Sequence, residues 1–404
     1  MTPTRAEAFR FWARLGFISF GGPAGQIAIM HREIVERQRW LEEREFMQAL
    51  NVCMLIPGPE AMQLATWIGW RFHGTAGGVV AGLCFILPSV LILLGLSFVY
   101  AMHGDVPAVA AALAGLKATV IAMIVQALVR IGGRALKQPV HWALAVAALV
   151  LVAGRLLSFP LVLVGAALVG LLLGREEARE DPSPRPAFPW RTLAGGIALW
   201  AAPAVAVLAL AGPQSLYASL YRFFTGVALV TFGGAYAILT WVNQQAVEAY
   251  GWVTQADTIA GLALAETTPG PLIMVLQFIG FMAGWHGTGG SGDAATAAAL
   301  LTSWATFVPA AVLILLAAPY VLRLAGNRRL SAALAGITAA VVGVIASLAI
   351  AFGRNILFPG SPAAPDWGAI AIAALAFAAL QWTRLDVMWV IAGGLVAGLA
   401  LGFA

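Results

Sequence analysis

The sequence predicts an all-α polytopic membrane protein built from two inverted-topology repeats, and three observations support this prediction. Of the 404 residues, 61% are hydrophobic and only 10% are charged, and the mean hydropathy of +0.88 lies far above that of soluble domains. Apolar runs recur with lengths near the ~20 residues that cross a bilayer. Glycine–proline motifs within this apolar sequence occur twice at one fixed spacing.

Nine apolar runs are the predicted membrane crossings. The net charge of +5 does not indicate nucleic-acid binding, because most Lys and Arg residues lie at the ends of these runs, as the positive-inside rule expects. Cys53 and Cys84 lie in apolar sequence and are interpreted as packed thiols rather than as a disulfide. The nine runs are 76–101, 107–128, 139–157, 159–174, 192–211, 294–322, 331–352, 366–382 and 385–403.

Two motifs define the duplication. Phe20-Gly21-Gly22 and Pro57-Gly58-Pro59 recur 212 residues later, without a gap, as Phe232-Gly233-Gly234 and Pro269-Gly270-Pro271. Further along the chain the spacing increases to 221, as shown by helix prolines at 88 and 309. Helix breakers inside apolar sequence are tolerated only where they line a cavity, which is typical of transporters made of two repeats.

The duplication predicts three segments. The first repeat covers 1–174 and the second covers 218–404, and residues 175–217 form a cytoplasmic linker followed by a joining transmembrane helix. Between Arg222 and Arg323 the second repeat has no Lys or Arg, whereas the matching part of the first repeat has six arginines. The positive-inside rule therefore places the two repeats in opposite orientations, with the N-terminus in the cytoplasm.

The segments that carry the motifs have two possible placements in the membrane. Re-entrant hairpins that turn at Gly21-Gly22-Pro23 and at Pro57-Gly58-Pro59 leave fewer arginines outside the cell than full crossings do, so the hairpin interpretation is favoured. Half-helices over 46–56 and 60–71 would be about 16–18 Å long, which reaches roughly mid-bilayer. The alternative is that these segments are proline-kinked spans, which gives the conventional count of thirteen helices.

Each break presents the start of a new helix, where backbone N–H groups lack helical partners and the helix dipole is positive. Such a start binds an anion without any charged side chain. Glycine permits the tight reversal, and proline at the first helical position removes no useful donor. The predicted substrate-binding residues of the breaks are Gly21, Gly22, Pro23, Gln26, Pro57, Gly58, Pro59, Gly233, Gly234, Pro269, Gly270 and Pro271.

Four charged residues inside apolar sequence are further candidates, because charge within a membrane is costly and usually functional. Arg14 and Lys117 are predicted to contact the anion, although Arg14 could instead reach the lipid headgroups. Glu266 and Glu60 are the candidates for proton coupling. Their alternatives are structural: Glu60 suits the positive end of a helix, and Glu266 could be a hydrogen-bonded neutral carboxyl.

The sequence gives no support for enzymatic chemistry. It contains no metal-ligand spacing, no phosphate-binding glycine loop and no nucleophile elbow. We therefore expect a protein that is not an enzyme and that has neither a metal nor another cofactor.

The order, spacing and duplication of the two motifs resemble the chromate ion transporter family in its long, two-domain form. The resemblance covers nearly the whole chain and implies a carrier of chromate, a tetrahedral dianion, in the bacterial inner membrane, usually associated with efflux and chromate resistance. The second repeat has Ala235 where the first has Pro23, which suggests that the first repeat dominates substrate contact.

Two alternatives remain at this stage. The natural substrate could be sulfate or another small anion that chromate mimics, or the chain could be a membrane scaffold or sensor that transports nothing. A scaffold would be expected to carry a large soluble domain, and the sequence shows none. The expected partners are a small oxyanion and the lipid bilayer, with a homodimer as the candidate assembly.

Overall fold

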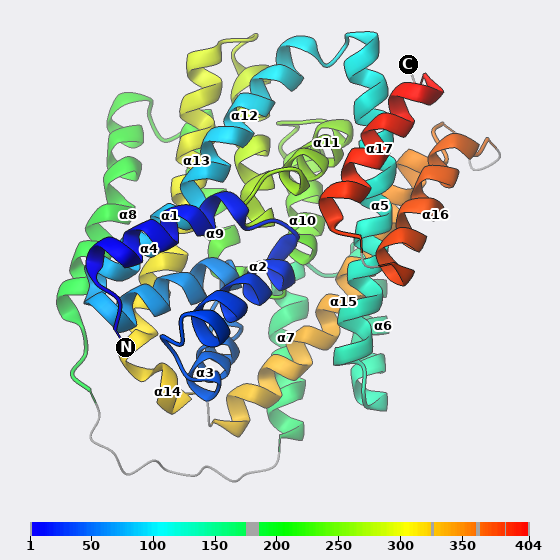
Figure 1. Ribbon diagram of the computed structural model, residues 1–404. Coiled ribbons are helices and arrows are strands. Elements are labelled where there is room, and N and C mark those ends of the chain that lie inside the picture. The colour runs from blue at the N-terminus through cyan, green and yellow to red at the C-terminus, as the bar shows by residue number, and fades with distance from the viewer. Residues whose placement is uncertain (1, 175–185, 325–326, 361–363, 384, 403–404) are drawn as a thin grey trace. The chain divides into compact units, whose positions relative to one another are not determined.

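The computed structural model describes residues 2–174, 186–324, 327–360, 364–383 and 385–402, and all regular structure in these residues is helical (Figure 1). The prediction of an all-α polytopic membrane protein is confirmed. The predicted linker lies outside the described residues over 175–185. Five helical segments are long and apolar enough to cross a membrane, namely α4 (Glu60–His103), α5 (Pro107–Ala135), α8 (Trp190–Leu210), Gly292–Leu324 and α15 (Arg328–Leu357).

Four of the nine predicted crossings form helices that are shorter than the thickness of a bilayer core. Their helices have 15 or 16 residues, which corresponds to about 22–24 Å at 1.5 Å per residue, less than the ~30 Å hydrocarbon core of a bilayer. In one of them the chain leaves the helix at Gly154 and Arg155, and Arg155 has a φ of 57°. The four helices are α6 (Pro139–Ala153), α7 (Phe159–Leu173), α16 (Trp367–Trp382) and α17 (Val387–Leu401).

The chain forms two compact units that do not coincide with the two halves of the sequence. Each unit takes segments from both halves, so the repeat boundaries remain a prediction from the sequence. Unit 1 contains the described parts of 1–94, 174–235 and 268–331, and unit 2 contains those of 95–173, 236–267 and 332–404.

In unit 1, α13 (Gly292–Ala317) packs against α8, α9 (Leu216–Val230) and α12 (Val275–Gly287) (Figure 1). Glycines allow the close contact of α12 with α13, because a Cβ at Gly280 would overlap Thr302. Small residues at helix contacts are typical of membrane proteins. The other elements of this unit are α1 (Arg5–Ile18), α2 (Gly22–His31), the π-helix η1 (Arg32–Arg37), α3 (Glu43–Cys53), the first part of α4, η3 (Leu272–Met274), η4 (Ala318–Tyr320) and α14 (Val321–Leu324).

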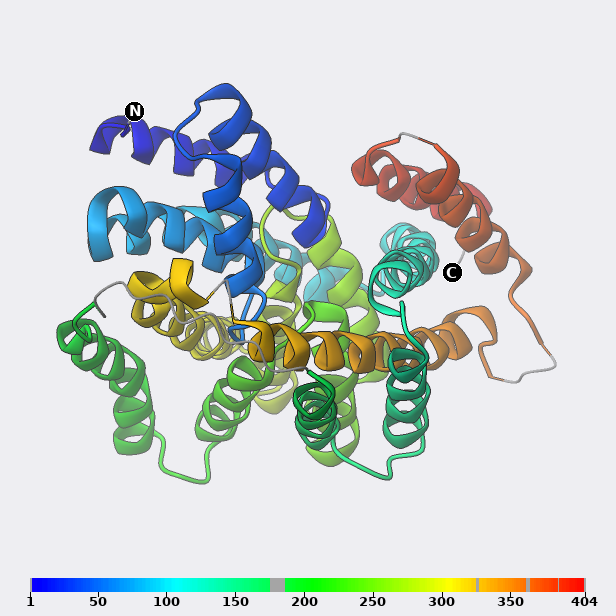
Figure 2. The same ribbon diagram turned by 90° about the horizontal axis from the view of Figure 1, so that it is seen from below.

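In unit 2, α5 packs against both α16 and α17 (Figure 2). A Cβ at Gly115 of α5 would overlap the carbonyl oxygen of Gly394 in α17, so the glycine is needed for this contact. In the same way, a Cβ at Gly343 of α15 would overlap the carbonyl oxygen of Ala145 in α6. The elements α10 (Ala235–Asn243), η2 (Gln244–Ala249) and α11 (Gln255–Glu266) also belong to this unit, apart from the first residue of α10.

The order of elements repeats along the sequence. Helices α1, α2, η1 and α3 of the first half are followed in the second half by α9, α10, η2 and α11. The two π-helices stand 212 residues apart and end in equivalent backbone hydrogen bonds: Trp40 donates to Ile34 at 2.9 Å, and Trp252 donates to Ala246 at 2.8 Å. This agreement in a rare type of helix supports the duplication seen in the sequence.

Candidate functional site

Glycines at the four predicted helix breaks have left-handed backbone conformations. L side chains rarely adopt such conformations, so glycine is required for each reversal. The breaks fall where the sequence predicted them, between α1 and α2, α3 and α4, α9 and α10, and α11 and η3. The φ values are 85° for Gly21, 66° for Gly22, 133° for Gly58, 74° for Gly233, 86° for Gly234 and 99° for Gly270.

The breaks of the two halves are bonded to each other. The N–H of Gly58 donates to the carbonyl oxygen of Thr231 at 2.9 Å, and the N–H of Gly270 donates to that of Ser19 at 2.8 Å. Gly270 and Thr231 lie 212 positions after Gly58 and Ser19, so the second bond is the equivalent of the first with the halves exchanged. All four residues belong to unit 1. Such an exchange is what an approximate two-fold axis through the motifs produces.

Packing around the motif glycines follows the same exchange. A Cβ on Gly58 would lie 2.7 Å from the Cβ of Ala310, and a Cβ on Gly270 would lie 2.9 Å from the Cβ of Ser89. Ala310 follows the helix proline at position 309, and Ser89 follows its counterpart at position 88. Each Pro-Gly-Pro motif therefore packs against the proline-containing helix of the other half.

The four helix starts line a single cavity within unit 1. Its lining includes the first residues after all four breaks, where N–H groups without helical partners favour an anion. The cavity volume of 20 Å³ has room for about one water molecule. A tetrahedral oxyanion is larger than water, so the cavity in this structure is too small to hold one. The lining residues are Pro23, Gln26, Pro59, Glu60, Ala61, Thr231, Gly234, Ala235, Pro271, Leu272 and Ile273.

Two buried glutamines hold the carbonyl groups of the Pro-Gly-Pro motifs. The Nε2 of Gln26 donates to Gly270 at 2.5 Å, and the Nε2 of Gln63 donates to Pro57 at 2.8 Å. In the part of the chain that the structure describes, the buried Oε1 atoms of both glutamines have no hydrogen-bond partner. Both glutamines come from the first half, and the second half has Ile238 and an apolar valine at the matching positions. The two amide side chains that hold these carbonyl groups thus both come from the first half.

Glu60 is the acidic residue among those that line the cavity. It is the first residue of α4, where the positive end of the helix dipole stabilises a carboxylate. Its charge would repel an oxyanion in the same cavity, and the repulsion is strong because little water separates them. An anion bound in this cavity would therefore favour the neutral form of Glu60.

Comparison with known proteins connects this geometry to a family. The sequence profile of the family described as "Chromate transporter" matches residues 6–171 and, a second time, residues 218–399. The chain belongs to the chromate transporter family. The two matches agree with the two sets of helix breaks, and the family is one of transporters rather than enzymes.

Relatives of this family member span nearly its full length. A protein named "Chromate transport protein" from Pseudomonas aeruginosa is 34% identical over 397 residues, which are 98% of this chain and 91% of the relative. The "Probable chromate transport protein" of Synechococcus elongatus is 30% identical over 86% of this chain and 84% of its own length. A "Chromate transport protein" from Cupriavidus metallidurans is 26% identical over 98% of this chain and 93% of its own length. No solved structure matches the chain.

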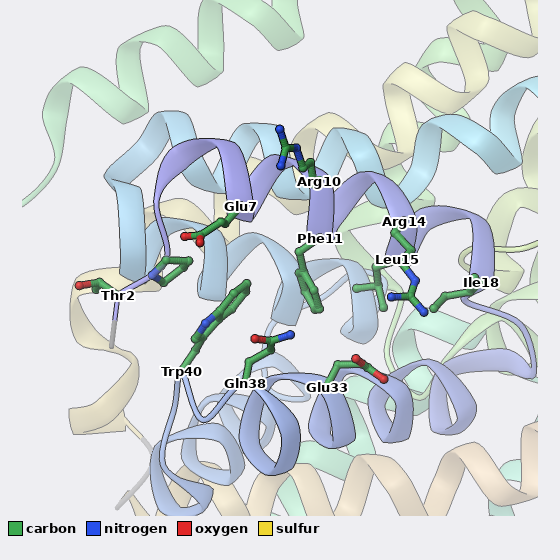
Figure 3. A pocket seen from close by; sticks show the side chains of 11 residues that line it. Thr2, Glu7, Arg10, Phe11, Arg14, Leu15, Ile18, Glu33, Gln38 and Trp40 are labelled. Atoms are coloured by element: carbon green, nitrogen blue, oxygen red, sulfur yellow. The ribbon is translucent and has the colours of Figure 1, made fainter.

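Not all predicted site residues of this family member lie together. Arg14 is exposed and lines a different cavity of unit 1, formed by α1 with the residues before it and by η1 with the segment after it (Figure 3). Lys117 and Glu266 belong to unit 2. The other predicted residues lie at the breaks. Among these, seven are absent from the cavity lining and shape the turns instead: Gly21, Gly22, Pro57, Gly58, Gly233, Pro269 and Gly270.

Lys117 has an acidic neighbour that the sequence analysis missed. It lies on α5 within electrostatic range of Asp257 on α11. Asp257 is buried, and it accepts a hydrogen bond from the Tyr100 hydroxyl at 2.9 Å. It also accepts bonds from the N–H and hydroxyl of Thr254 at 2.8 and 2.7 Å, which forms a capping box. In the sequence, the three-residue spacing of Thr254 and Asp257, which is that of a capping box, was the signal that could have identified Asp257.

Glu266 has a similar environment at the other end of α11. Its carboxyl accepts a hydrogen bond from the Tyr236 hydroxyl, and it lies within electrostatic range of Arg130 on α5. The contact between α5 and α11 therefore carries two carboxyl–tyrosine pairs, each near one cation of α5. Buried charges of this kind need both a counter-ion and hydrogen bonds. Arg130 was not identified from the sequence.

Proposed function

We propose that this protein transports chromate or a related tetrahedral oxyanion across the bacterial inner membrane, in the direction of efflux. The observation that carries the proposal is the single cavity lined by the first residues after all four helix breaks. Backbone N–H groups at helix starts, which lack partners within the helix, can replace the water around an oxyanion without a fixed positive charge. The names of the relatives support chromate as the substrate.

Alternating access between two inverted repeats is the proposed mechanism. The reciprocal bonds of Gly58 and Gly270 support an approximate two-fold relation between the motifs. An axis in the plane of the membrane would give each half the opposite orientation, which agrees with the one-sided distribution of arginine along the sequence. The N-terminus is then cytoplasmic, and the closed cavity is an occluded form that opens when one set of helix starts separates from the other.

Proton coupling through Glu60 is the proposed energy source. A dianion and an ionised Glu60 cannot share a small cavity at low cost, so protonation of Glu60 and binding of the anion are linked. Glu266 is the second candidate, although it belongs to unit 2 and is held by Tyr236. Lys117 remains a candidate contact for the anion in unit 2, where Asp257 partly balances its charge.

Chromate flux into proteoliposomes tests the proposal. We expect uptake by the wild-type protein and a loss of at least about tenfold in Gly58→Ala, because the new Cβ would collide with Ala310 and strain the turn. Gly133→Ala is the matched control, since a Cβ at this glycine of α5 meets no atom within 4 Å. A wild-type protein without flux for any oxyanion would instead support the scaffold or sensor alternative.

Sulfate is the second candidate substrate, because it has the same tetrahedral shape and charge as chromate, and the helix starts offer no group that would distinguish the two. Competition in the same proteoliposomes separates the alternatives: if sulfate inhibits chromate uptake at lower concentration than chromate inhibits sulfate uptake, sulfate is the better substrate. A homodimer is the proposed assembly, and light scattering of the purified protein in detergent tests it.

A further inference from the structure

Arg14 lines a second cavity of unit 1, separate from the cavity at the helix breaks. This second cavity has a volume of 600 Å³, far larger than that of the cavity at the helix breaks. Phe11 of α1 and Trp40 of the segment after η1 project into it from opposite sides (Figure 3). Their rings meet edge to face, with centroids 5.1 Å apart. Leu15 and Ile18 extend the apolar lining along α1.

Two arginines of α1, Arg10 and Arg14, line this cavity. The Arg14 side chain makes no hydrogen bond or ion pair within the described ranges of the chain. Figure 3 shows it on the side of α1 that faces Glu33, whereas the Arg10 side chain lies at the edge of the lining, on the opposite side of the helix from Phe11. The two acids of the lining are already engaged. Glu7 accepts bonds from the N–H and hydroxyl of Thr4, both at 2.8 Å, and Glu33 accepts one from Arg37 at 2.7 Å.

The neighbouring face of α1 is suited to hydrocarbon. Phe9 and Phe17 lie two helical turns apart on one face and are 55% and 61% exposed. The adjacent face carries Arg10, Arg14 and Ile18 at intervals of four residues. A stripe of exposed aromatic residues beside a stripe of arginines is typical of a helix that lies at the boundary between headgroups and acyl chains.

We propose that this cavity binds the phosphodiester headgroup of an anionic phospholipid, with Arg14 at the phosphate and with Phe11 and Trp40 against the glycerol and the first acyl carbons. A bare oxyanion would leave the apolar lining in contact with water and would find only exposed arginine side chains, which bind an anion weakly in water. A lipid covers both parts of the lining. The second half has Gly226 in place of Arg14, so the site occurs once per chain.

Native mass spectrometry of the full-length protein in detergent tests the proposal by titration with short-chain phosphatidylglycerol. We expect one tightly bound lipid on the wild-type protein. Its affinity should fall about tenfold in Arg14→Gln, which loses one charge-assisted hydrogen bond, and should largely persist in Arg14→Lys. Arg222→Gln is the matched control, because Arg222 is exposed on α9, the counterpart of α1, and does not line the cavity.

Three outcomes would overturn the proposal. The first is equal binding of phosphatidylglycerol and phosphatidylcholine, which would remove the role of net charge. The second is an equal loss of lipid affinity in Arg14→Gln and Arg222→Gln when both variants keep the thermal stability of the wild-type protein. The third is displacement of the lipid by millimolar sulfate or chromate, which would identify the cavity as a site for the free anion. If Arg14→Gln does not fold, the comparison of the two lipids and the sulfate titration, both on the wild-type protein, still test the proposal.

Discussion

The N–H of Gly58 donates a hydrogen bond to the carbonyl oxygen of Thr231, 173 positions later in the sequence, at 2.9 Å. Gly270 and Ser19 repeat this bond with the two halves exchanged, at 2.8 Å. Each bond satisfies a carbonyl group at the end of one helix with the N–H of a turn that begins another, so neither break leaves these polar groups unpaired in apolar surroundings. The two halves are therefore joined at the point where their helices are interrupted.

Replacement of Gln26 by Leu should destabilise the joined breaks. The buried amide donates to Gly270 and to Ser19, at 2.5 and 3.3 Å, and an apolar side chain leaves both carbonyl groups without this donor. We expect a loss of about 1–3 kcal/mol in stability and reduced chromate flux. Thermal unfolding in detergent measures the first effect. The control is Gln126→Leu on α5, where the glutamine is only partly buried; an equal loss there would contradict the role of Gln26.

Glu60→Gln should remove the pH dependence of transport. If anion binding requires a neutral Glu60, as proposed, flux through the wild-type protein should decrease as the pH rises and the carboxyl ionises. The variant has no charge at this position and should transport equally over the same pH range, although without proton coupling. Initial rates of chromate uptake at several pH values, with the membrane potential clamped, provide the measurement. Glu266→Gln is the comparison, and the idea fails if only that variant becomes insensitive to pH.

Lys117→Met should reduce chromate flux if the ammonium group contacts the anion. The alternative is that Lys117 only balances the charge of Asp257. The double variant with Asp257→Asn separates these roles, because it restores neutrality without restoring a cation. Flux that stays low in the double variant supports contact with the anion, whereas flux that returns to the wild-type rate assigns Lys117 a structural role. Unchanged flux in the single variant Lys117→Met would exclude both the contact with the anion and the charge-balancing role.

The start of α1 should be sensitive to acid. Hydrogen bonds from the N–H and hydroxyl of Thr4 hold the pKa of Glu7 below its ordinary value. A carboxyl with a lowered pKa stabilises the folded state above its unfolded pKa, and this contribution is lost as the pH falls through the lowered value. Hydrogen exchange at the first turn of α1 should therefore accelerate at acid pH. In Thr4→Ala the exchange should be fast at neutral pH as well; continued protection would contradict the role of the capping box.

The sequence predicted the parts of this protein that depend on local backbone chemistry. Glycine and proline in apolar surroundings identified all four breaks, because a left-handed turn and a helix without its next N–H are properties of a few neighbouring residues. The regular spacing of 212 residues gave the duplication, and it extends to the paired π-helices. Crossing lengths were less predictable, since apolar residues continue past the turn at Gly154 where α6 ends.

The candidate site was predicted in part. Helix starts after each break were expected to form it, and their first residues do share a cavity. Gln63 and Asp257 were missed because each acts through a partner that is distant in the sequence or hidden by its role in capping. Arg14 was predicted to contact the anion or to reach the lipid headgroups, and the structure places it in a cavity separate from the one at the breaks.

The composition and the short motifs of the sequence were enough to determine that this chain is helical, that it lies in a membrane, and that its helices are interrupted twice in each half. Only the tertiary structure decided which interruptions meet, which glutamine binds the carbonyl group of Gly270, and which charged residues lie away from the cavity at the breaks. The physical reason is that backbone conformation is set by neighbouring residues, whereas a shared cavity depends on packing between segments that can be more than two hundred residues apart, such as Gln26 and Gly270.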